Sequence, residues 1–126
     1  MCHIQLPGWG PGDLCENKYA PAKYAEDAML RFLRDMGKAE TAANEYKAKI
    51  FGGGTVIDTE NQKTGIASRN VESALNMLKK YNIPVVSQDT GGNFYRKLFF
   101  DVWSGEVWVK KTQYNMAQEK NNSSGR

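Results

Sequence analysis

Two stretches of the chain repeat apolar residues at helical spacing. In each, the intervals of three and four residues place the apolar side chains on one face of a helix. The first stripe is Ala25, Ala28, Met29, Phe32, Leu33 and Met36, and the second is Val71, Ala74, Leu75 and Leu78. The pattern predicts amphipathic helices over about residues 22–36 and 69–81. Gly37 is expected to end the first helix, because glycine favours the position after a helix.

The second half of the chain instead alternates apolar and polar residues, as strands do. The residues predicted to share one face are Leu98, Phe100 and Val102 in one run and Val107 and Val109 in the next. The two runs flank Trp103-Ser104-Gly105, which is a turn sequence. The pattern therefore predicts a β-hairpin.

Shorter extended runs complete the expected elements, at residues 2–6, 46–51, 56–57 and 85–87. Two helices and about five strands in mixed order predict the α+β class, as an α/β sandwich with two main helices on a mixed sheet and a C-terminal β-hairpin. Residues 1–113 are expected to form a single domain. Residues 114–126 are rich in Gln, Asn, Lys and Ser, which predicts a disordered tail.

Composition narrows the class of protein. The 126 residues make one domain of 14.2 kDa with a mean hydropathy of −0.62, and no apolar run is long enough to cross a membrane. The net charge of +3 comes without clustered Lys and Arg, so no nucleic-acid partner is expected. The chain shows no secretory pattern, which favours a cytoplasmic location. Two cysteines and one histidine offer no zinc ligand set, and neither a metal nor a cofactor is expected.

Candidate chemistry centres on His3 and two cysteines. His3 is the single histidine, so any imidazole general base in this chain must be His3, although a lone histidine is more often a surface residue. Cys15 and His3 are conceivable as a nucleophile and its base, but nothing in their spacing demands it. Cys2 is expected to be a small buried hydrophobic residue.

The glycine run Gly52-Gly53-Gly54 follows a predicted strand and suggests a phosphate cradle. It lacks the Lys-Ser/Thr pair of a P-loop and the spacing of a dinucleotide fingerprint. Positive φ angles and close backbone approach are the better interpretation of these glycines.

Several segments, in the same order along the chain, resemble the chemoreceptor glutamine deamidase family, CheD. Residues 1–7 are similar to its G-G-M-A-H-x-x-L-P stretch, and Lys23-Tyr24-Ala25 to its K/R-Y-A helix start. The other similar blocks are residues 48–54 (A-K-I-F-G-G-A in the family), 66–71 (I-G-x-R-N-x), 89–97 (D-x-G-G-x-x-G-R-K) and the hairpin over 99–110. The resemblance covers about residues 1–111.

This resemblance implies a hydrolase that converts receptor glutamine side chains to glutamate in chemotactic adaptation. A cysteine thiolate attacks the amide carbon with help from a histidine, ammonia leaves, and water hydrolyses the thioester. No cofactor is implied. The implied partners are methyl-accepting chemoreceptors and a CheC-type phosphatase in the cytoplasm.

The sequence departs from the family at the nucleophile. The family carries it in an L-G-S-C segment, with a supporting Thr nearby, upstream of the histidine stretch, and these 126 residues contain neither. Only the general base carries over, as His3, while Cys2 stands at the family's Ala position. The domain over 1–113 is therefore expected to lack the family's N-terminal strands, and the chain as written to lack deamidase activity.

Three hypotheses remain open. The chain is a family deamidase whose N-terminal segment is missing from this sequence, or a non-catalytic module that binds a receptor or CheC. A third, weaker hypothesis is a basic and aromatic binding domain that uses Trp9, Trp103 and Trp108. If strands are missing, an exposed apolar surface is expected near His3, Ile50 and Val86.

Overall fold

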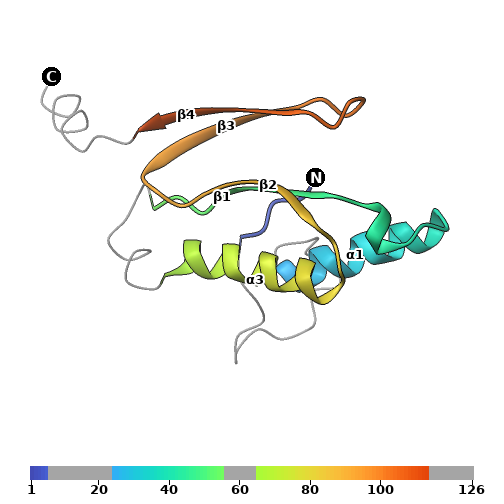
Figure 1. Cartoon of the computed structure of the whole chain (residues 1–126). Helices are drawn as coiled ribbons and strands as arrows, with labels where there is room; N and C mark the ends of the chain where they lie inside the picture. Colours follow the sequence, from blue (N-terminus) through green and yellow to red (C-terminus); the bar gives the residue numbers. More distant parts are fainter. Residues whose placement is uncertain (6–23, 56–64, 114–126) are drawn as a thin grey trace, which may run out of the picture.

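The computed structural model describes residues 1–5, 24–55 and 65–113. Its elements, in chain order, are α1 (Ala25–Lys38), the 3-10 turn η1 (Ala43–Glu45), β1 (Ala48–Gly52), α3 (Ile66–Lys80), β2 (Val85–Thr90), β3 (Phe94–Phe100) and β4 (Val107–Gln113). Figure 1 shows three levels: the helices lie on one side of β1 and β2, and the hairpin of β3 and β4 lies on the other.

The strands form two pairs. β1 pairs in parallel with β2, and β3 pairs antiparallel with β4. The predicted α+β class, with two helices and a C-terminal hairpin, is confirmed. The expected mixed sheet is divided, in the described residues, into a parallel pair and an antiparallel pair that do not share a ladder.

The core lies between α1, the end of α3 and the start of β1. Met29, Met36 and Ile83 form its buried centre, and partly buried side chains of Phe32 and Met77 pack against it. The predicted stripe on α1 is confirmed, since its buried residues are Ala25, Ala28, Met29 and Met36. In contrast, α3 has no buried residue, and its partly buried Met77 and Leu78 pack against the core.

The prediction that Gly37 ends α1 is wrong, because the helix continues to Lys38. The left-handed residue comes later, at Glu40 with φ 56°. Thr41 donates hydrogen bonds to the Met36 carbonyl from its backbone nitrogen at 3.0 Å and from Oγ1 at 3.1 Å. These bonds satisfy a carbonyl at the end of the helix, so no glycine is needed to terminate it.

The glycines between β1 and α3 allow close approach, as predicted. Gly52 and Gly53 have φ angles of 117° and 69°, which glycine adopts readily. A Cβ on Gly53 would collide with the Val71 side chain of α3 and come within 3.3 Å of the Ala67 carbonyl oxygen. Glycine at this position therefore sets how closely the end of β1 approaches α3.

The hairpin has the predicted shared face. Leu98 lies opposite Val109 and Phe100 opposite Val107. Val102 belongs to the turn rather than to the strand, and its side chain is exposed. Both strands extend further than predicted, because their outer residues pair as far as Phe94 with Gln113.

Residues 1–5 contain no regular strand, so the strand predicted over 2–6 is wrong for these residues. The predicted extended run at 56–57 and the predicted tail at 114–126 lie outside the described residues. No helix in the described ranges is both long enough and apolar enough to cross a membrane.

Candidate functional site

His3 lies exposed in the N-terminal segment formed by residues 1–5. This segment is attached to α3 through Asn70, whose Nδ2 donates a hydrogen bond of 3.0 Å to the backbone carbonyl of Gln5. The other amide atom of Asn70, Oδ1, is buried and has no hydrogen-bond partner in the described part of the chain. The side chain of Asn70 therefore fixes the backbone two residues from His3. An exposed imidazole can accept a proton from a group brought by a substrate.

Cys2 does not have the position predicted for it. It was expected to be buried on an apolar strand face, but it is an exposed residue with a free thiol. The reason is that residues 1–5 join no strand pair in the described structure. Partial desolvation raises the pKa of the Cys2 thiol. A raised pKa keeps the sulfur protonated at neutral pH, so Cys2 is a weak nucleophile.

Cys15 lies outside the described residues. The conceivable pairing of its thiol with His3 therefore stays a prediction. His3 is the single histidine of the chain, so no second imidazole can lie beside it. Within the described ranges no group of three His, Cys, Asp or Glu side chains gathers in a way that could hold a metal ion.

A charged cluster joins β2 to the hairpin. Arg96 of β3 donates to Asp89 Oδ1 from Nη2 at 3.1 Å and from Nε at 3.2 Å, and Nη2 also donates to the Gly91 carbonyl at 2.6 Å. Lys111 of β4 places Nζ 3.2 Å from Asp89 Oδ2. Desolvation raises the pKa of Asp89, but hydrogen bonds from Lys111 and Arg96 outweigh it and leave the pKa below its ordinary value. Asp89 therefore remains ionised and holds both strands of the hairpin.

Two glycine turns meet beside this cluster. The Gly91 nitrogen donates to the Gly52 carbonyl at 2.9 Å, and the Thr55 nitrogen donates to the Gly92 carbonyl at 3.0 Å. A Cβ on Gly54 would lie 2.9 Å from the Phe94 carbonyl oxygen. The turn after β1 is thus packed against the turn after β2, which agrees with the close approach expected of these glycines.

Apolar side chains are exposed on the strands. Val86 is 50% exposed and Ile50 is half-buried, close to where an uncovered apolar surface was expected. The hairpin exposes more, with Trp103 97% and Trp108 54% exposed. The third sequence hypothesis names Trp103 and Trp108, but periodicity could not predict their exposure, because alternation shows which residues share a face but not whether anything covers that face.

The chain was compared with known protein families. Residues 11–111 match the model of the family described as "CheD chemotactic sensory transduction". The chain belongs to the CheD family.

Individual proteins of the CheD family are also similar to the chain in sequence. The chain is 33% identical over 122 residues to a protein of Pseudomonas fluorescens named "Probable chemoreceptor glutamine deamidase CheD", with 94% of this chain and 67% of that protein covered. A relative of the same name from Maridesulfovibrio salexigens is 34% identical over 121 residues, with 92% and 71% covered. A third, from Pseudomonas savastanoi, is 31% identical over 113 residues, with 87% and 62% covered. The chain thus spans about two thirds of the length of these CheD proteins.

The CheD match includes some candidate residues and not others. Asn70, Asp89 and Arg96 lie inside the matched range, whereas His3 precedes it. The role of His3 as general base therefore stays a prediction. Sequence reasoning found the blocks that contain Asn70 and Asp89 but missed what these two side chains contact, because their partners are distant in sequence.

Proposed function

We propose that this CheD-family chain serves in the hydrolysis of chemoreceptor glutamine side chains to glutamate. The observation that carries the proposal is the family match over residues 11–111, supported by relatives named as chemoreceptor glutamine deamidases. The reaction belongs to the amide hydrolases and requires no cofactor. The chemoreceptor is then a protein substrate met in the cytoplasm.

In the proposed reaction a cysteine thiolate forms a bond to the amide carbon of the glutamine, and the C–N bond breaks as ammonia leaves. Water then hydrolyses the thioester, which yields glutamate and restores the thiol. His3 is the proposed general base that accepts the thiol proton and later returns one to the leaving nitrogen. Its exposure allows a protein substrate to reach the imidazole.

The proposed nucleophile is a cysteine outside these 126 residues. Cys2 is disfavoured because desolvation raises the pKa of its thiol. Cys15 follows His3 in the chain, whereas the family's nucleophile precedes the histidine stretch. We therefore expect the 126-residue chain alone to release no ammonia from a receptor, because water is a poor nucleophile toward an amide.

The test measures ammonia release from a purified chemoreceptor cytoplasmic fragment. The proteins compared are the 126-residue chain, its Cys15→Ser variant, and a chimera that carries the N-terminal segment of the Pseudomonas fluorescens relative before Met1. Of these three proteins, we expect only the chimera to release ammonia. The chimera with His3→Ala should lose that activity.

Other outcomes contradict parts of the proposal. Turnover by the 126-residue chain that Cys15→Ser abolishes makes Cys15 the nucleophile. If the chimera with His3→Ala turns over as fast as the chimera itself, His3 is not the general base. A folded chimera without turnover on any receptor fragment counts against the deamidase function of this chain.

The family resemblance also supports a CheC-type phosphatase as a second protein partner. Co-purification of the chain with a CheC-type protein from the same genome tests this part. A CheC-type protein that elutes independently of the chain at micromolar concentrations contradicts it.

A further inference from the structure

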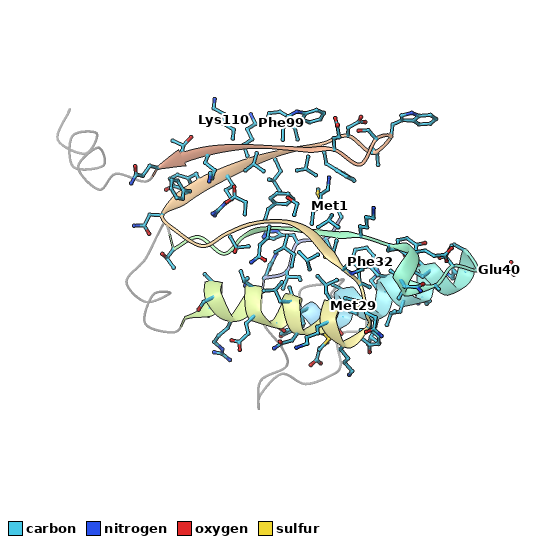
Figure 2. The ribbon with its side chains drawn as sticks, in the orientation of Figure 1. Met1, Met29, Phe32, Glu40, Phe99 and Lys110 are labelled. Carbon is cyan, nitrogen blue, oxygen red and sulfur yellow. The ribbon has the colours of Figure 1, made fainter. Side chains whose placement is uncertain are left out.

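The hairpin has two faces of different character. Because side chains alternate along a strand, Phe94, Arg96, Leu98 and Phe100 share the face that carries the contact with Asp89. The opposite face carries Lys97 and Phe99 of β3, with Lys110 and Trp108 directly across from them on β4. Figure 2 shows Phe99 and Lys110 on the side of the hairpin that points away from β1 and β2. We call these four residues the outer patch.

The hairpin contains two adjacent cross-strand pairs of like charge. Arg96 lies opposite Lys111, and Lys97 lies opposite Lys110. Like charges directly opposite one another destabilise a strand pair. On the inner face, which points toward β2, Asp89 offsets this repulsion, because its carboxylate contacts both Arg96 and Lys111.

In the part of the chain that the structure describes, the outer pair has no such carboxylate. Lys97 and Lys110 are exposed, and neither forms an ion pair within the described ranges. Lys97 instead places Nζ 5.5 Å from the centre of the Phe99 ring. Two acidic residues, Asp101 and Glu106, lie in the turn that joins β3 to β4, and the Asp101 carboxylate accepts hydrogen bonds there from the Trp103 nitrogen and the Ser104 hydroxyl. Within the described ranges neither carboxylate forms an ion pair with Lys97 or Lys110.

Aromatic surface adjoins the two lysines. Phe99 and Trp108 lie directly opposite each other and are 51% and 54% exposed. Tryptophan and other aromatic residues are enriched among the residues that dominate binding energy in protein interfaces. The outer patch thus combines an unneutralised pair of cations with a flat apolar platform.

We propose that the outer patch binds an acidic segment of a protein partner. A carboxylate of that segment lies between Lys97 and Lys110, as Asp89 does between Arg96 and Lys111, and an apolar side chain next to it covers Phe99 and Trp108. Two opposed cations suit one carboxylate, whereas a nucleic-acid backbone is recognised by Lys and Arg clustered along a whole face or helix. This inference goes beyond the proposed function, since binding here does not require deamidase activity.

The test uses the full 126-residue chain and three probes of equal length. The first is a helical peptide in which Glu and Leu residues alternate from turn to turn. The second is the same peptide with Gln in place of Glu, and the third is a single-stranded DNA. Binding is followed by NMR through the indole N–H signal of Trp108. One variant combines Lys97→Gln with Lys110→Gln, and the matched control combines Lys47→Gln with Lys79→Gln, two exposed lysines elsewhere on the surface.

We expect the acidic peptide to shift the Trp108 signal and to bind at least about tenfold more tightly than its Gln counterpart. This advantage should shrink as the salt concentration rises, because salt screens the charges. The Lys97/Lys110 variant should bind the acidic peptide about tenfold less tightly and the control within about twofold of the parent. Thermal unfolding of the Lys97/Lys110 variant should occur no lower than in the parent, because the two substitutions remove a repulsion.

The inference is overturned if the two double variants bind alike, or if the parent fails to bind the acidic peptide at millimolar concentration. Tighter binding of the DNA than of the acidic peptide also overturns it and makes the patch a nucleic-acid surface. A folded Trp108→Thr variant that retains full affinity, measured through the backbone amide signals of Lys97 and Phe99 instead of the lost indole signal, removes the aromatic half of the proposal.

Discussion

The Arg96 guanidinium donates two hydrogen bonds to one oxygen of Asp89, from Nε at 3.2 Å and from Nη2 at 3.1 Å. The arginine side chain is only 7% exposed, whereas the Asp89 side chain is 27% exposed. A buried guanidinium depends on its partner, because removal from water costs free energy unless the group is paired and hydrogen-bonded. This contact therefore fixes β3 on the end of β2.

Replacing Arg96 by lysine should lower the free energy of unfolding by about 1–3 kcal/mol. An ammonium group cannot reproduce the fork that reaches Asp89 and the Gly91 carbonyl together. Urea unfolding followed by tryptophan fluorescence measures the change. The control is Lys97→Arg on the outer face, which should change stability by less than about 0.5 kcal/mol. Equal stability of the two variants contradicts this account of Arg96.

Acid should weaken the hairpin through Asp89 and Asp101. Hydrogen bonds from the Ser104 hydroxyl and the Trp103 backbone lower the pKa of Asp101, and the pKa of Asp89 is also lowered. Because these folded-state pKa values lie below the unfolded value of about 3.9, the stabilisation is complete above about pH 5 and is lost as pH falls through the folded values.

We therefore expect constant stability between about pH 7 and 5 and a decline below about pH 4. The measurement is urea unfolding across this range for the parent and for Asp89→Asn. The variant should be less stable at neutral pH, and its deficit should shrink as the acid range is entered. A deficit that stays constant with pH contradicts an ionised Asp89 as the source of the stabilisation.

Residues close in sequence were predictable, and contacts between distant ones were not. The apolar spacing of Ala25 to Met36 predicts α1, and the alternation around Leu98 and Val109 predicts the hairpin. The bond from Lys49 Nζ to the Gly105 carbonyl joins residues 56 positions apart, and no periodicity points to it. The candidate site depends on contacts between residues that are distant in sequence. The sequence therefore predicts its residues as parts of motifs but not the partners that their side chains contact.

Gly53 is expected to tolerate no side chain. Gly53→Ala places a Cβ against Val71 and forces alanine to a φ near 69°, so the free energy of unfolding should fall by about 1–3 kcal/mol. Gly37 is the control, since it lies inside α1 with nothing within 4 Å of an added Cβ. Gly37→Ala should stabilise by about 0.5–1 kcal/mol. Thermal unfolding measures both variants. Gly53→Ala should lower the unfolding temperature and Gly37→Ala should raise it, and changes of the same sign contradict this account.

Asn70 is predicted to order the segment that carries His3. Asn70→Ala removes the hydrogen bond to the Gln5 carbonyl, and it also removes the buried Oδ1 that has no partner in the described residues. The lost bond and the removed desolvation penalty oppose each other, so stability should change by less than about 1 kcal/mol. The order of the segment should nevertheless fall, because its backbone loses this hydrogen bond to α3.

The measurement is the heteronuclear NOE of the backbone amides of residues 2–5, which reports motion on the picosecond to nanosecond timescale. Asn76→Ala is the matched control, since Asn76 is an exposed residue of the same helix and the change in helix propensity is the same. We expect a marked drop in the NOE for Asn70→Ala and none for Asn76→Ala, with similar unfolding temperatures. If both variants keep the segment equally ordered, Asn70 does not position His3, and the imidazole must be held by contacts other than this hydrogen bond.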